Sequence, residues 1–189
     1  MKEFIKKLGS FFLDIIQVIV LALSIFVISY LFLFQPHQVR GNSMYANFYD
    51  QEFLLTDKIS YRFGEPQRGD VVIFKAPPSE PCAETECEYI KRIIGLPGEM
   101  IKIQDGKIVI YKNSESKILN EIKYLAGIET GGDLTVTLKE NEYFVLGDNR
   151  PFSYDSRRFG PVSKEKIIGR VVLRAWPLNS FDKVEAPAY

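Results

Sequence analysis

Hydrophobic positions along this chain follow two different patterns. From Ile15 to Phe34 the sequence IIQVIVLALSIFVISYLFLF is almost continuously apolar and contains no charged residue. A helix of about 20 apolar residues is long enough to cross the hydrocarbon core of a bilayer. A helix that packs on the core of a soluble protein has one polar face, and this run has none. The pattern predicts one transmembrane helix, at residues 11–34.

Charges beside the apolar run predict its orientation. Lys2, Lys6 and Lys7 precede it, and only Arg40 follows closely. Because lysine and arginine concentrate on the cytoplasmic side of membrane helices, we expect the N-terminus in the cytoplasm and the remainder outside. The sequence FQPHQVRG that follows lacks the small-x-small site of a removable signal peptide, so the helix is predicted to remain as an anchor.

Beyond the anchor, short apolar runs alternate with turn residues, a pattern typical of β-strands. Strands are predicted in GDVVIFKAPP, EYIKRIIGLPGE, NEYFVLGDN and IIGRVVLRAWP, each stopped by glycine or proline. The segment EMIKIQDGKIVIYKN alternates on both sides of Asp105-Gly106, a dipeptide that favours a tight hairpin turn. Only SKILNEIKYLAG has a short helical period. We therefore expect a mainly β domain.

A more polar segment, from Asn113 to Lys139, separates the later strands and contains the sequence TGGD. Its two glycines predict local flexibility, and its polarity is typical of an insertion. The predicted organisation is a short cytoplasmic segment at residues 1–10, a membrane anchor at 11–34 and an extracytoplasmic β domain at 35–189. The polar insertion occupies about 113–140 of that domain.

Charge and cysteine content exclude several classes of function. The chain has 24 basic and 24 acidic residues, so no net charge favours nucleic acid. Cys82 and Cys87 fall on the external side of the predicted topology, where either a disulfide or two free thiols are expected. Two cysteines and one distant histidine make a poor zinc site. We expect no metal, no organic cofactor and no nucleic-acid partner.

Ser43 lies in RGNSMYANFYD, shortly after the anchor. A serine hydroxyl at neutral pH needs a neighbouring base before it can act as a nucleophile. His37 is the only histidine, and its position six residues before Ser43 is unusual for a catalytic serine–histidine pair. A lysine can take this role when burial lowers its pKa.

Lys91 is the lysine that a strand could bury. It lies in the middle of EYIKRIIG, where alternation places it on one face with Tyr89 and Ile93 and places Arg92 on the other face. Arginine stays protonated in proteins, so of these two basic residues only Lys91 could act as a base. The alternative is a lysine of an edge strand that points to water.

The segment GDNRPFSYDSRRFGPV concentrates turn formers and paired charges. The hydroxyl of Ser153 could accept a hydrogen bond from a neutral lysine amine without adding charge. The carboxylate of Asp155, paired with an arginine, could hold the loop rigid. The alternative is a solvated turn with surface ion pairs.

Together and in this order, GNSM, RGDVVIF, YIKRIIGLPGE, GDNRPFSYDSRRFG and GRVVLRAWPL resemble the motifs of bacterial type I signal peptidases. These are membrane-bound serine endopeptidases with a Ser/Lys dyad. The resemblance implies a mainly β fold, a signal-peptidase-like β-barrel or sheet catalytic domain on one N-terminal transmembrane helix. It also implies removal of signal peptides from secretory precursors, after small residues and without a cofactor. The expected partners are signal-peptide-bearing preproteins and the lipid bilayer of the cell membrane, and we expect a monomer.

The resemblance assigns roles to individual residues. Ser43 is the nucleophile, Lys91 is the general base, and Ser153 orients the lysine. Residues that match structural supports of the site are Asp148, Asp155 and Arg157. Residues that match the lining of the substrate pockets are Val39 and Ile90.

The sequence departs from the family close to the nucleophile. Ala46 and Asn47 stand where the family has proline and threonine, and the loss of proline removes a rigid turn. Gly41 stands where some relatives have a serine that helps bind the oxyanion, so we expect the backbone N–H of Ser43 to carry more of that role. Two alternatives remain: an inactive membrane-anchored β domain that binds extracytoplasmic partners, and another Ser/Lys protease of related fold.

Overall fold

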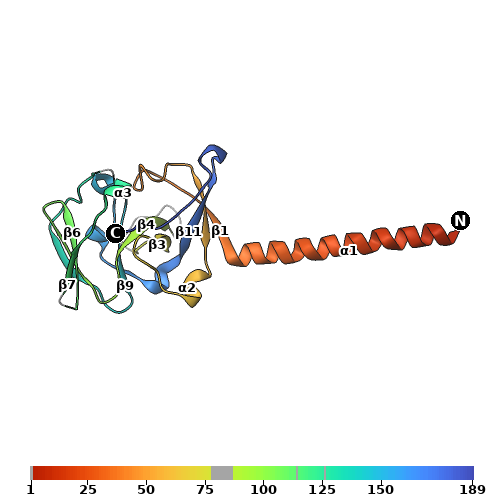
Figure 1. Ribbon diagram of the computed structural model, residues 1–189, viewed down its shortest axis with the longest axis horizontal. Helices are drawn as coiled ribbons and strands as arrows, with labels where there is room; N and C mark the ends of the chain where they lie inside the picture. Colours follow the sequence, from red (N-terminus) through yellow and green to blue (C-terminus); the bar gives the residue numbers. More distant parts are fainter. Residues whose placement is uncertain (1, 78–86, 114, 126) are drawn as a thin grey trace.

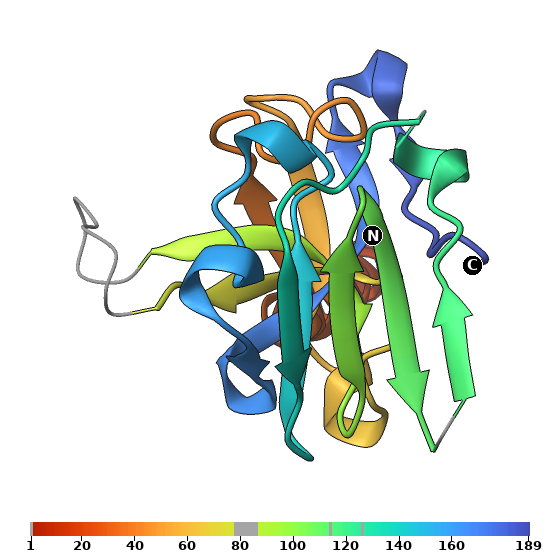
Figure 2. The same cartoon turned by 90° about the vertical axis from the view of Figure 1, so that its left-hand side faces the viewer.

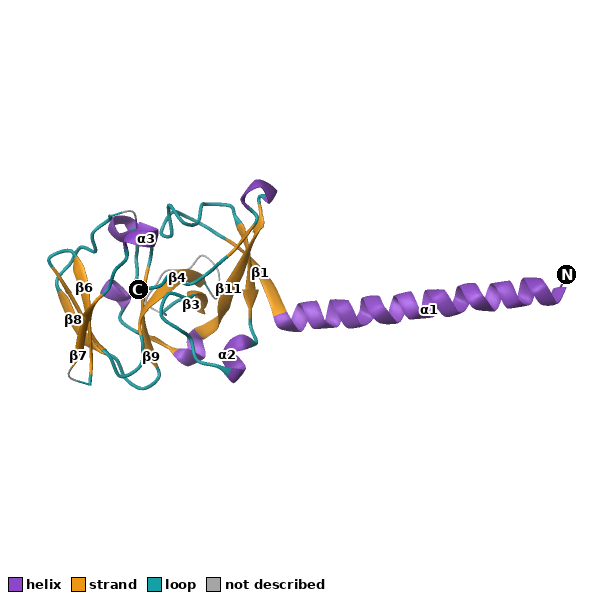
Figure 3. Cartoon of the chain, in the orientation of Figure 1, coloured by secondary structure: helices purple, strands orange, loops and turns teal. Residues whose placement is uncertain are grey.

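The computed structural model describes residues 2–77, 87–113, 115–125 and 127–189 (Figure 1). A long helix, α1 (Lys2–Leu33), projects away from a β-rich body, and Figure 3 shows the division between the two. Within α1, the stretch Lys6–Ile28 is long and apolar enough to cross a membrane. Its apolar side chains are exposed, as expected of a helix whose solvent is lipid.

The end of α1 differs from the predicted span by one residue. Phe34, the last residue of the predicted span 11–34, already belongs to strand β1 (Phe34–Gln38) and pairs with Asp57. No loop separates the helix from this strand. The first strand of the body is therefore a direct continuation of the predicted anchor.

The larger sheet is antiparallel throughout and follows the order β1-β2-β11-β3-β4-β9-β10, with β12 paired to β11. Its further strands are β2 (Phe53–Asp57), β3 (Val71–Lys75), β4 (Glu88–Gly95), β9 (Glu142–Leu146), β10 (Val162–Ser163), β11 (Ile167–Trp176) and β12 (Asp182–Lys183). The predicted strands in GDVVIFKAPP, EYIKRIIGLPGE, NEYFVLGDN and IIGRVVLRAWP are confirmed as β3, β4, β9 and β11.

The smaller sheet has the order β7-β6-β5-β8. Its strands are β5 (Met100–Gln104), β6 (Lys107–Lys112), β7 (Glu115–Ile118) and β8 (Leu134–Thr137). The predicted hairpin is confirmed, since Asp105 and Gly106 join β5 to β6 with φ angles of 51° and 75°. The predicted helical period is only partly realised: β7 pairs with β6, and helix α3 is limited to Ile122–Leu125.

The two sheets share a hydrophobic core. Ile94 from β4 and Phe144 from β9 pack against Ile101, Ile103 and their neighbours in the smaller sheet. Short helices close the loops between strands: α2 (Ser60–Phe63), η1 (Arg150–Phe152), α4 (Ser156–Phe159), η2 (Lys164–Lys166) and η3 (Leu178–Ser180). The predicted fold class, a mainly β body on one N-terminal helix, is confirmed.

Strand β4 is an interior strand of the larger sheet, because it pairs with β3 on one side and β9 on the other. Lys91 lies opposite Val72 of β3, and only 4% of its surface is exposed. The alternative of an edge-strand lysine that points to water is therefore wrong. The side chain is instead buried on one face of the sheet.

Cys87 is disulfide-bonded. Cys82, the other cysteine in the prediction of either a disulfide or free thiols, lies outside the described residues.

Candidate active site

Ser43 and Lys91 lie in hydrogen-bond contact. Lys91 Nζ is 2.7 Å from Ser43 Oγ, and it also donates to the carbonyl of Ile90 at 2.8 Å. The nitrogen is within the range from which a general base can take the serine proton. The geometry therefore joins a nucleophile to a base across two segments of the chain that are far apart in sequence.

The loop that carries Ser43 is fixed by its apolar neighbours. Met44 and Phe48 are 1% and 3% exposed, and both belong to a hydrophobic cluster with Val71 of β3. The ends of the loop are tied together, because Val39 N–H donates to the carbonyl of Glu52 at 2.8 Å. Met44 and Phe48 thus pack in the core and leave Ser43 at the edge of the loop.

The environment of Lys91 favours its neutral form. Burial lowers the pKa of Lys91 to about 8, because removal from water penalises the ammonium more than the amine. The charges of Asp155 and Asp148 act in the opposite direction and raise the pKa, but their effect is smaller. A substantial fraction of the amine can therefore be neutral near physiological pH.

The loop after β9 contacts the loop that carries Ser43, and Figure 2 shows the two loops beside each other. Asn149 N–H donates to the carbonyl of Ser43 at 3.0 Å, and its side-chain amide donates to the carbonyl of Asn42 at 2.9 Å. Gly147 lies so close that a Cβ there would be 2.4 Å from the Ser43 carbonyl oxygen. Only glycine fits between these two loops.

Ser153 is brought to the site, but its hydroxyl does not contact Lys91 in this structure. Its Oγ is buried and has no hydrogen-bond partner among the described residues. A Cβ built on Gly147 would lie 2.1 Å from this oxygen, which places it beside the Ser43 loop. The unpaired hydroxyl is thus available to a group that enters or rotates within the site.

Each predicted support residue takes part in an ion pair, and Asp148 pairs with Arg92, which was not predicted. Arg92, next to Lys91, donates to Asp148 from Nε at 2.9 Å and from Nη2 at 2.6 Å. Arg157 makes the same two-point contact with Asp155, at 2.8 Å from each nitrogen. Two-point pairs of this kind fix orientation as well as distance. The solvated-turn alternative is wrong for these pairs, because Asp148 and Asp155 are 1% and 0% exposed.

Sequence reasoning missed an arginine that is fully enclosed next to these pairs. Arg150 is 1% exposed and donates to the carbonyl of Gly147 at 3.0 Å and to Glu121 at 2.7 and 2.9 Å. Glu121 belongs to the segment predicted as a flexible insertion. The charge of Arg150 in the predicted loop was a visible signal, but nothing local to the sequence indicated its partner.

A groove of about 800 Å³ opens beside the dyad. Ser43 and Lys91 line it, together with Val39 and Ile90, the residues predicted to form substrate pockets. Strand β1 contributes one wall and β4 another. His37 also lines the groove, but its ring contacts Thr56 Oγ1 at 2.9 Å and Glu88 at 3.0 Å, so its partners are not the serine.

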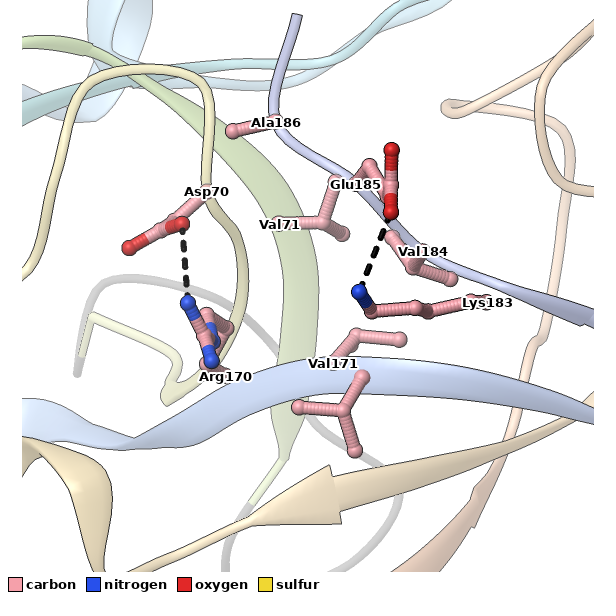
Figure 4. Close-up of a pocket in the computed structure, with 9 residues that line it drawn as sticks. Asp70, Val71, Arg170, Val171, Lys183, Val184, Glu185 and Ala186 are labelled. Atoms are coloured by element: carbon pink, nitrogen blue, oxygen red, sulfur yellow. Dashed lines mark hydrogen bonds and ion pairs between the residues drawn. The ribbon is translucent and has the colours of Figure 1, made fainter.

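Figure 4 shows a second, smaller pocket between β3, β11 and the C-terminal segment, with a volume of about 330 Å³. Asp70 pairs with Arg170 at 3.8 Å and Lys183 with Glu185 at 3.0 Å. It contains none of the predicted site residues. The groove beside Ser43 is therefore the candidate active site.

Comparison with known proteins decides the family. Residues 12–176 match the family described as signal peptidase, peptidase S26. The chain belongs to this family. The family predicted from the sequence motifs is thereby confirmed, and with it the predicted class of enzyme, a signal peptidase that is a serine endopeptidase.

Individual members of the signal peptidase family match most of the chain. Signal peptidase I V of Bacillus subtilis is 37% identical over 147 residues, which cover 72% of this chain and 82% of that protein. Signal peptidase I T of the same organism is 34% identical over 180 residues, which cover 92% and 90%. A probable signal peptidase I-2 of Synechocystis is 34% identical over 147 residues, and the match covers 78% of this chain but 65% of that protein.

Among solved structures, a crystal structure of a signal peptidase I from Enterococcus faecalis V583 matches with 35% identity and a TM-score of 0.46. The match covers 57% of this chain and 97% of that one.

Proposed function

We propose that this chain removes N-terminal signal peptides from secretory precursor proteins, with Ser43 as nucleophile and Lys91 as general base. The observation that carries the proposal is the 2.7 Å contact between a buried lysine nitrogen and a serine hydroxyl at the edge of a groove. Burial supplies what the chemistry needs, because it makes the neutral amine accessible near neutral pH.

The reaction follows from the proton positions. Neutral Lys91 accepts the proton of Ser43, and the alkoxide attacks the carbonyl of the peptide bond to be cut. The resulting ammonium gives its proton to the leaving amine of the mature protein. The same amine then activates a water molecule that hydrolyses the acyl-enzyme. With a pKa of about 8, about a tenth of the lysine is neutral at pH 7.

Two further groups complete the proposed site. The N–H of Gly41 donates to Asp50 at 2.7 Å, so the N–H of Ser43 is the donor we propose for the oxyanion. Ser153 is proposed to orient the neutral amine. Its buried and unpaired hydroxyl supports this role, because a neutral amine that has released its bond to Ile90 needs an acceptor.

The substrate would lie in the groove between β1 and β4. Val39 and Ile90 are proposed to limit the residues before the cut to small side chains, since both present branched apolar side chains to the groove. Val39 is also 4% exposed and packed in the core, which makes its position rigid.

The membrane anchor is proposed to bring substrate and groove together. We propose a single-pass, monomeric protein in the cell membrane, with a cytoplasmic N-terminus and residues 35–189 outside. Residues 34–42 join α1 to Ser43, and a stretch of that length reaches at most about 30 Å when extended. The serine therefore stays near the bilayer surface, where the signal peptide of a precursor is also held.

A cleavage assay tests the proposal. The full chain, purified in detergent, is mixed with a secretory precursor and compared with Ser43→Ala and Lys91→Ala. Lys183→Ala is the matched control, because its side chain pairs with Glu185 in an exposed position. The parent and the control should release the signal peptide, and both dyad variants should not.

Three results would contradict the proposal. Near-parental cleavage by either dyad variant would show that Ser43 and Lys91 are not the catalytic pair. Failure of the parent to cleave any precursor would favour the inactive membrane-anchored domain. Cleavage of a substrate without a signal peptide, but of no precursor, would favour another Ser/Lys protease.

A further inference from the structure

Asn47 occupies one of the positions at which this chain departs from its family, and both hydrogens of its side-chain amide are used. Nδ2 donates to Asp148 Oδ2 at 2.8 Å and to the carbonyl of Tyr124 at 2.9 Å. Each partner can only accept in these contacts. The position therefore faces two acceptors, and asparagine supplies a donor to each.

The first partner connects Asn47 to the base. Asp148 is 1% exposed and holds the guanidinium of Arg92 at two points. Arg92 is the residue next to Lys91 on β4. The path from Asn47 to Asp148 to Arg92 thus joins the loop of the nucleophile to the strand of the base. The bond from Asn47 is partly buried, and the bonds between Asp148 and Arg92 are fully buried, where an unpaired group is costly.

The second partner connects Asn47 to the predicted insertion. Tyr124 lies on α3, and the guanidinium of Arg92 stacks 4.5 Å from the centre of its ring. The hydroxyl of Tyr124 also accepts a hydrogen bond from Arg150 at 3.2 Å. This one short helix therefore contacts the nucleophile loop, the base strand and the loop after β9.

The backbone of Asn47 is held as well. Arg174 of β11 donates to the carbonyl of Asn47, and its guanidinium lies 5.3 Å from the ring of Phe48. A residue fixed through both its main chain and its side chain has little freedom to move. Because Ser43 lies four positions earlier on the same loop, its position is restricted as well.

We propose that Asn47 is a positioning residue for the Ser43/Lys91 dyad, an inference that rests on the function proposed above. Its two hydrogen bonds constrain the loop that the family holds with a proline at the neighbouring position, here Ala46. Asn47 touches neither substrate nor dyad. It acts through Asp148 and Tyr124, which set the distance between the serine loop and β4.

Three substitutions at position 47 separate positioning from general stability. Asn47→Ala removes both donors, and Asn47→Asp keeps the shape but replaces the donors with a charge that faces Asp148. Asn47→Thr, the residue typical of the family, keeps one donor. Ala46→Ser is the matched control, because it alters an exposed neighbour on the same loop.

The readouts are kcat and KM for precursor cleavage by the full chain in detergent, with Tm measured for each variant. We expect kcat to fall about tenfold or more in Asn47→Ala and further in Asn47→Asp, at temperatures well below Tm. KM should change little, since the groove between β1 and β4 is untouched. Asn47→Thr should recover part of the lost kcat, and Ala46→Ser should match the parent.

The inference is overturned if Asn47→Ala or Asn47→Asp keeps the parental kcat. It is also overturned if kcat falls only where Tm drops to the assay temperature, because Asn47 would then act on stability alone. Failure of this inference is distinguishable from failure of the proposed function. The latter shows as an inactive parent or an active Ser43→Ala variant, whatever residue stands at position 47.

Discussion

Lys91 Nζ lies 2.7 Å from Ser43 Oγ, although the two residues are 48 positions apart in the sequence. An interior strand carries the lysine, and a loop fixed by buried apolar residues carries the serine. The strand and the loop meet at this contact, and burial of the lysine there lowers its pKa.

Gly147→Ala should abolish most of the activity. A Cβ at this position would lie 2.1 Å from Ser153 Oγ and 2.4 Å from the carbonyl oxygen of Ser43, so the serine loop would have to move. A displacement of about 1 Å can cost about a hundredfold in rate. Gly131→Ala is the matched control, because a Cβ there meets no atom within 4 Å. Equal activity of the two variants in precursor cleavage would contradict this packing.

Asp148→Ala should strongly destabilise the folded protein. The substitution leaves the guanidinium of Arg92 buried without its charged partner, and loss of one member of a buried pair costs about 3–5 kcal/mol. The control Lys183→Ala breaks an exposed pair and should cost under about 1 kcal/mol. Thermal or denaturant unfolding of the full chain in detergent measures both, and similar losses would argue that the Arg92–Asp148 pair is weak.

Lys91→Met should inactivate the enzyme yet raise its stability at neutral pH. Below a pH of about 8 the lysine is charged in both states, and the folded protein bears the full cost of burying the ammonium. As pH rises from about 8 toward the ordinary value of 10.5, the folded state loses its proton first and this cost disappears. The free energy of unfolding of the variant should therefore exceed that of the parent by up to about 3 kcal/mol at pH 7, and the difference should shrink at alkaline pH.

Unfolding curves of the parent and of Lys91→Met at neutral and alkaline pH check this prediction. A variant that is less stable than the parent at neutral pH, or a difference in stability that grows with pH, would show that burial of the Lys91 ammonium does not destabilise the folded protein.

Much of the fold could be predicted because its signals are local. Alternation and turn residues indicated the strands, and the Asp105-Gly106 hairpin followed from two residues alone. The burial of Lys91 was suggested by its place in the middle of a strand. It was decided by tertiary packing, which places the Lys91 amine against the loop of Ser43.

The supporting network could not be predicted because its contacts are long-range. Asn47 meets Tyr124 and Asp148 across 77 and 101 positions, and Arg150 meets Glu121 across 29. The insertion that carries Tyr124 and Glu121 is polar in sequence, which suggested a flexible segment. Tyr124 and Glu121 instead face Arg92 and Arg150, which other parts of the chain supply.

The dependence of kcat/KM on pH tests the central claim most directly, since it reports the ionisation of the base in the free enzyme. Precursor cleavage by the parent and by His37→Gln would be measured from about pH 5 to about pH 10. Because the neutral amine of Lys91 is the reactive form, activity should rise with a midpoint near a pKa of about 8, and the midpoint should be the same in both proteins. Burial lowers the pKa of His37 below the ordinary histidine value of about 6.5. A midpoint in that lower range that vanishes in His37→Gln, or a flat profile, would contradict the assignment of Lys91 as the base.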